Sequence, residues 1–276
     1  MVVTACASAR NPGATFAPRP ASGNAPSIES QDKALAAGLL RLLVHPSPDA
    51  EKAVSAEYTR LGLLEDAFAH LTAAIQMDKR DAEAYDGRAR IWRDWGFPAR
   101  GLGDAARAVY FAPRSAAAHN TWGTLLAGTG SLADARHEFD RARALDPDGG
   151  YAQTNLCYVE FVSGDIPEAI ADCLRALEID PGSIVAKNNL ALSFAAAGQY
   201  ATAAEEFLAT GDVMRGHYNT GVALLAAGRF ADARKAFETV SASHALGRLA
   251  RARAEQARAL AAGTLALGPS RAATDR

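Results

Sequence analysis

A 34-residue period runs through the middle of this 276-residue chain. Three predicted helices end at Pro113, Pro147 and Pro181, and these prolines are spaced 34 residues apart. A glycine precedes each proline by 17 residues, so every period divides into two similar halves. Periods of roughly 20–50 residues are typical of architectures in which one small unit is stacked repeatedly. The sequence therefore predicts a stacked array.

Aligning the chain on this period gives six blocks. The blocks are 48–81, 82–115, 116–149, 150–183, 184–213 and 214–247. The midpoint is always glycine: Gly62, Gly96, Gly130, Gly164, Gly198 and Gly228. A small residue recurs in the first half: Ser55, Ala89, Gly123, Cys157, Ala191 and Gly221. A position in the second half is often bulkier: Leu71, Ala105, Phe139, Cys173, Phe207 and Phe237. Each block thus predicts two antiparallel helices joined by a glycine turn.

The composition agrees with helices rather than sheets. Hydrophobic residues make up 49% of the chain and aromatic residues only 7%, so most apolar side chains are small, with alanine the most frequent. Alanine favours helices and disfavours strands. The net charge of −2 gives no basic footprint for nucleic acid. No uninterrupted apolar stretch reaches the length of about 18 residues that suggests a transmembrane helix.

The block pattern resembles the tetratricopeptide repeat family over roughly residues 48–247. The clearest copy runs from Asn155 through Gly164 and Ala169 to Pro181. The resemblance implies an all-α fold: a right-handed α-solenoid of about six helix-turn-helix repeats, with capping helices at both ends. It also implies a concave groove lined by the first helix of each repeat.

Three blocks depart from the pattern at their C-terminal ends. Lys79 stands where the first block should have proline, and Ala245 stands there in the sixth. The fifth block is four residues short, which is about one helical turn. We therefore expect the second helix of the fifth block to end early, near Gly211.

The segments outside the blocks predict caps and irregular ends. Residues 1–30 are rich in proline and small polar residues and predict a disordered linker. The superhelix should occupy 31–267, with a first capping helix from about Ser30 to Val44 and a last one over 244–267. Residues 268–276 predict a disordered tail. A basic membrane-surface helix is the alternative for 244–267, and the lack of aromatic anchors disfavours it.

Cys6 is a candidate lipidation site. The string Val-Thr-Ala-Cys that ends at Cys6 resembles a bacterial lipobox, in which signal peptidase cuts before a cysteine that becomes acylated. A signal peptide needs a charged segment and roughly 7–15 apolar residues, whereas only five residues precede Cys6. Either the true start lies upstream of Met1, or the match is accidental.

No catalytic constellation stands out in the sequence. The six histidines lack metal-ligand spacing with cysteine or carboxylate, and no phosphate-binding loop or nucleophile motif occurs. We therefore predict a noncatalytic protein without metal or cofactor. Cys157 and Cys173 occupy the small and the bulkier position of one block, which favours buried free thiols that fill space. A disulfide is the alternative if the domain is periplasmic.

Family geometry assigns candidate partner-binding residues to the groove. They are Arg90, Arg93, Tyr151, Tyr158, Phe161, Asn188, Leu192, Tyr218 and Val222. This register predicts a groove that is charged toward its N-terminal end and aromatic or aliphatic toward its C-terminal end. Aromatic and arginine side chains commonly anchor interfaces, so we expect an amphipathic helix or extended peptide to bind along the aromatic part. Alternatively, the C-terminal helix or a second subunit covers this surface.

The sequence thus predicts a noncatalytic scaffold that binds a partner protein or peptide, and no nucleic acid. With a true lipobox at Cys6, it would resemble tetratricopeptide lipoproteins that assist pilus or secretion assembly, anchored at the periplasmic face of a bacterial membrane. The alternative is a cytoplasmic adaptor or regulatory module without a lipid anchor.

Overall fold

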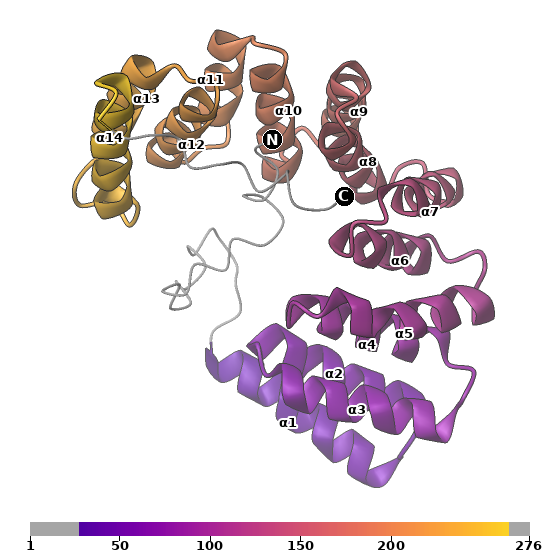
Figure 1. Ribbon diagram of the computed structural model, residues 1–276. Helices are drawn as coiled ribbons and strands as arrows, with labels where there is room; N and C mark the ends of the chain where they lie inside the picture. Colours follow the sequence, from indigo (N-terminus) through magenta and orange to yellow (C-terminus); the bar gives the residue numbers. More distant parts are fainter. Residues whose placement is uncertain (1–27, 265–276) are drawn as a thin grey trace. The chain divides into compact units, whose positions relative to one another are not determined.

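The computed structural model describes residues 28–264, which fold into fourteen α-helices without a strand (Figure 1). The predicted all-α solenoid class is confirmed. These residues divide into two compact units, here called the N-terminal unit, which ends at Ala152, and the C-terminal unit, which begins at Gln153. Each unit is described by itself. A single continuous superhelix over 31–267 therefore stays a prediction.

The first seven helices belong to the N-terminal unit. They are α1 (Ile28–Val44), α2 (Pro48–Leu61), α3 (Leu64–Met77), α4 (Ala82–Asp94), α5 (Pro98–Phe111), α6 (Ala116–Gly128) and α7 (Leu132–Leu145). Helix α8 (Gly150–Ser163) contains the unit boundary. The C-terminal unit continues with α9 (Ile166–Ile179), α10 (Ile184–Ala196), α11 (Tyr200–Leu208), α12 (Val213–Ala226), α13 (Phe230–Glu238) and α14 (Gly247–Ala261).

Each predicted block contains two helices joined at its glycine. All six turn glycines have φ between 73° and 88°, a left-handed conformation that glycine adopts without steric cost. The first helices begin at side-chain caps in most blocks. Ser47, Asp81, Ser115, Ser183 and Asp212 each accept a hydrogen bond from the backbone N–H three residues later. The local sequence therefore determines both the turn and the start of these hairpins.

Complementary volumes hold the two helices of a hairpin together. A Cβ atom added to Gly123 would lie 2.6 Å from the ring of Phe139, and one added to Gly221 would lie 2.7 Å from Phe237. Both rings are buried. The small and bulkier positions of the blocks, 16 residues apart, thus face each other in these hairpins.

A buried polar contact also recurs across the hairpins, which the sequence analysis missed. The pairs are Glu51 Oε2 with His70 Nδ1 at 2.6 Å, His119 Nδ1 with Glu138 Oε2 at 2.6 Å, and Gln153 Nε2 with Asp172 Oδ1 at 2.7 Å. The partners are 19 residues apart in every pair. Such contacts satisfy polar groups that would otherwise be costly to bury.

The helix ends differ from the sequence prediction in several places. Helix α11 ends at Leu208, which confirms its expected early end. Helix α13 is also only nine residues long, which was not predicted; Thr239, Val240 and Ser241 follow it, and such residues favour helices weakly. The predicted capping helix 244–267 was too long, because α14 is followed by Gly263 in a left-handed conformation.

Helix α1 begins at Ile28, two residues before the predicted start. Cys6, most of the predicted linker 1–30 and the predicted tail 268–276 lie outside the described residues. Among residues 28–264, no helix combines the length and apolar character needed to cross a membrane.

Candidate partner-binding surfaces

In the N-terminal unit, Arg90 and Arg93 lie on α4. The Arg90 side chain is 57% exposed, and its Nη1 lies 4.0 Å from Asp86 Oδ2. Arg93 is held more closely, with its Nε 2.9 Å from Oδ1 of Asp94. Arg90 is therefore the less restrained of the two guanidinium groups.

Asp86 lies under these arginines and was not predicted as a site residue. Burial raises the pKa of Asp86 above its usual value, while the Thr121 hydroxyl, Arg90 and Arg93 oppose the shift. Oδ1 of Asp86 is buried and has no hydrogen-bond partner. The surface of α4 thus combines exposed cations with a poorly solvated acid.

Lys52 neutralises the acidic groups nearby. Its Nζ lies 3.0 Å from Asp49, 3.1 Å from Asp81 and 2.7 Å from Glu83. Burial by itself would lower the pKa of Lys52, but hydrogen bonds to these carboxylates raise it well above its usual range. The predicted charged character is present on α2 and α4, and most of these charges are paired.

Tyr151, the third candidate in the N-terminal unit, is tied locally. Its hydroxyl donates a hydrogen bond of 3.0 Å to Asp146 Oδ2. Burial and this carboxylate raise the pKa of Tyr151. Because Tyr151 precedes the unit boundary, its grouping with the candidates of the C-terminal unit stays a prediction.

The other six candidates lie in the C-terminal unit and are all half-buried. Tyr158 and Phe161 come from α8, Asn188 and Leu192 from α10, and Tyr218 and Val222 from α12. Asn219 Nδ2 donates to Asn188 Oδ1 at 3.3 Å, which joins α12 to α10. We call these six residues the α8–α10–α12 surface.

The rings on this surface are less free than the sequence suggested. Tyr218 lies 5.5 Å from the buried ring of Phe237, between ring centroids. Val222 packs against the same buried cluster, and Leu192 packs on the cluster of Ala191 and Phe207. The candidates are therefore partly core residues that present one edge to solvent.

Many aromatic side chains of the N-terminal unit instead form a packed cluster. Phe68, Trp92 and Trp95 lie 5.2 Å apart in each pairing of ring centroids. The Arg100 guanidinium lies 5.1 Å from the centroid of the half-exposed Phe97. This cluster went unnoticed in the sequence because its members share no repeat position.

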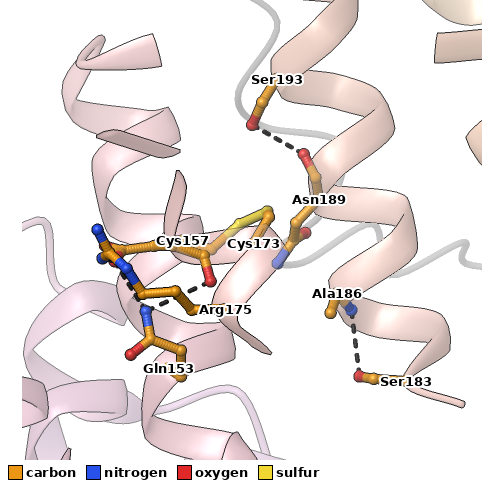
Figure 2. The surroundings of a disulfide bond; sticks show 9 residues. Gln153, Cys157, Cys173, Arg175, Ser183, Ala186, Asn189 and Ser193 are labelled. Carbon is orange, nitrogen blue, oxygen red and sulfur yellow. Dashed lines mark hydrogen bonds and ion pairs between the residues drawn. A yellow bond between two sulfur atoms is a disulfide. The ribbon is translucent and has the colours of Figure 1, made fainter. Parts of the chain in front are cut away.

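Figure 2 shows the disulfide that joins Cys157 of α8 to Cys173 of α9. The prediction of free thiols at these positions was wrong. Their Cα atoms are 5.0 Å apart, and both side chains are fully buried. Asp172, beside Cys173, accepts hydrogen bonds from Gln153 and Arg175. The repeat register brought the cysteines together, but the choice between thiols and disulfide depends on the redox environment.

Catalytic machinery was not predicted from the sequence, and no group of three or more potential metal ligands occurs among residues 28–264. The buried histidine His119 bonds to Glu138 and to the carbonyl of Pro113 within its own hairpin. The surfaces described above are therefore suited to binding through side-chain contacts.

Stacked helical hairpins with glycine turns define a helical-repeat protein. The sequence profile of the tetratricopeptide repeat matches residues 120–184 and 188–240. The chain is a tetratricopeptide repeat protein. Proteins of this family are typically noncatalytic scaffolds, and no enzyme family was indicated.

Several solved structures share this fold. The Cut9–Hcn1 hetero-tetramer of APC/C matches 82% of this chain with a TM-score of 0.69 and 15% identity, and this chain spans 46% of that one. A tetratricopeptide repeat protein from Parabacteroides merdae matches 83% of this chain and 93% of its own, with a TM-score of 0.64 and 14% identity. PilW, a type IV pilus biogenesis factor, matches 71% and 93%, with a TM-score of 0.64 and 23% identity. No match to a curated protein sequence was found.

Proposed function

We propose that the protein is a scaffold that binds a partner protein through the α8–α10–α12 surface. The observation that carries the proposal is that this surface groups tyrosine, phenylalanine and aliphatic side chains that are each half-buried. A ring already held by its neighbours loses little conformational entropy when a partner covers its free edge. Such anchored rings are suited to be binding hot spots.

The chemistry of this surface favours an amphipathic helix or an extended apolar peptide as the partner segment. None of its six residues is charged. The nearby cation Arg215 is already paired with Asp212, at 3.3 Å. Asn188 supplies polar contacts, while the surrounding side chains are apolar, which matches the face of an amphipathic helix.

The test is peptide selection on the full chain, followed by affinity measurements on variants. Tyr158→Ala and Leu192→Ala should each weaken binding of the selected peptides by about 30-fold, as expected for hot-spot residues. Tyr110→Ala is the matched control, because Tyr110 is 78% exposed on α5 of the other unit. Tyr218 is left intact because its ring packs on Phe237.

Equal weakening by Tyr110→Ala, or none by the two surface variants, would contradict the proposal. Circular dichroism should show the same helicity in all variants. If peptides fail to bind and Tyr158→Ala instead abolishes self-association of the chain, the surface belongs to a second copy.

We further propose that the protein is acylated at Cys6 and anchored at the periplasmic face of a membrane, where it assists pilus or secretion assembly. Two observations support this location. The lipobox-like string precedes Cys6, and the buried disulfide is of a kind that persists in oxidising compartments such as the periplasm. The fold shared with the pilus biogenesis factor PilW is consistent with this role. The alternative is a cytoplasmic adaptor, for which a buried disulfide is unusual.

Lipidation is tested in a bacterial host that expresses the gene with its upstream DNA. Labelled fatty acid should be incorporated into the chain and lost in Cys6→Ser, which should also leave the membrane fraction. Cys157→Ser is the matched control and should keep the label. An unlabelled wild-type chain recovered from the cytoplasm would support the adaptor instead.

A further inference from the structure

The outer face of α14 carries an unneutralised row of arginines. Helix α14 packs on α13 through Ala250, Ala254 and Ala257. Arg248, Arg251 and Arg258 are exposed. Their spacings of three and seven residues place them on one side of the helix. The helix therefore has a small-residue inner face and a basic outer face.

These three arginines differ from the other arginines of the C-terminal unit. Arg175, Arg215, Arg229 and Arg234 each form an ion pair with an acidic residue three or four positions away. Within residues 28–264, Arg248, Arg251 and Arg258 form no ion pair or hydrogen bond. Glu255 is the only acidic residue of α14 and pairs with none of them. The row is thus free to bind an anionic partner.

The spacing of the row favours an extended anionic surface. From Arg248 to Arg258 the helix advances about 15 Å, at about 1.5 Å per residue. One phosphate or carboxylate cannot engage charges spread over that length, whereas a layer of lipid headgroups can. Arginine also binds phosphate oxygens in a bidentate manner. The helix has no aromatic residue to anchor a peptide.

We propose that the outer face of α14 contacts the headgroups of an anionic lipid bilayer. The attraction is local, because the whole chain carries a formal net charge of −2 and physiological salt screens charges beyond about 8 Å. This contact orients the C-terminal unit against the membrane. The orienting role rests on the proposed acyl anchor, whereas the lipid contact itself does not.

The contact is measured by co-sedimentation of the unlipidated full chain with vesicles. Vesicles of equal parts phosphatidylglycerol and phosphatidylcholine should bind the chain at low salt, and pure phosphatidylcholine should not. The variant R248Q/R251Q/R258Q should bind about 100-fold more weakly. The variant R175Q/R229Q/R234Q removes the same charge from paired arginines and should bind like the wild type.

Equal weakening by the two triple variants, or equal binding to both vesicle types, would overturn the proposal. So would a chain that ignores anionic vesicles but binds polyglutamate through the same three arginines, because that result assigns the face to an acidic protein. The peptide-binding assay on the α8–α10–α12 surface is independent, so failure of either proposal can be recognised separately.

Discussion

Replacing Gly123 by leucine is expected to lower the free energy of unfolding of the N-terminal unit by about 3 kcal/mol, at the upper end of the usual cost of overpacking. Even a Cβ atom at this position would lie 2.6 Å from the Phe139 ring. That ring is 1% exposed and has no room to move away. Thermal or urea unfolding followed by circular dichroism measures the effect.

Two further variants test whether volume at this contact is the cause. Gly123→Leu with Phe139→Ala exchanges the bulky and the small partner and should recover most of the lost stability. Gly103→Leu is the matched control, since nothing lies within 4 Å of its added Cβ and it should be neutral or slightly stabilising. A stable Gly123→Leu variant would show that the hairpin contact is wrongly placed.

Removing the disulfide should have an effect of similar size. A cross-link between residues 16 apart is expected to contribute about 3 kcal/mol by restricting the unfolded chain. The variant Cys157→Ala/Cys173→Ala should lose that stability, and added reductant should destabilise the wild type but leave the variant unchanged. Urea unfolding with and without reductant makes the comparison.

A thiol titration in denaturant without reductant provides the direct check. The chain has three cysteines, and the disulfide leaves one reactive thiol, Cys6, in an unlipidated chain. Three reactive thiols in protein isolated from its native compartment would contradict the cross-link and would remove one support for the periplasmic location.

The repeat hairpins could be predicted from sequence because their requirements are local. A left-handed turn needs glycine, so Gly62 and its five equivalents identify the turns without knowledge of any distant contact. The facing of Gly123 and Phe139 follows from the same register. The early end of α11 was visible as a shortened block, whereas the equally short α13 was hidden in a block of full length.

The chemistry of the surfaces was less predictable because it depends on contacts between repeats and on the environment. Asp86 looks like any exposed acid in the sequence, and its burial under Arg90 and Arg93 appears only in the fold. Tyr218 was expected to present a free ring, but it shares its contacts with Phe237. The pairing of Cys157 with Cys173 requires an oxidant that no residue pattern specifies.

The two short helices α11 and α13 have a consequence for how the C-terminal unit responds to a partner. Each has nine residues, whereas α12 between them has fourteen. In a linear array every hairpin is stabilised only by itself and its neighbours, so shorter outer helices lower the cost of local unfolding there. Four residues of the α8–α10–α12 surface lie on the hairpins that contain these short helices. Binding energy would then be divided between holding the partner and suppressing local fluctuations, which couples recognition to rigidity.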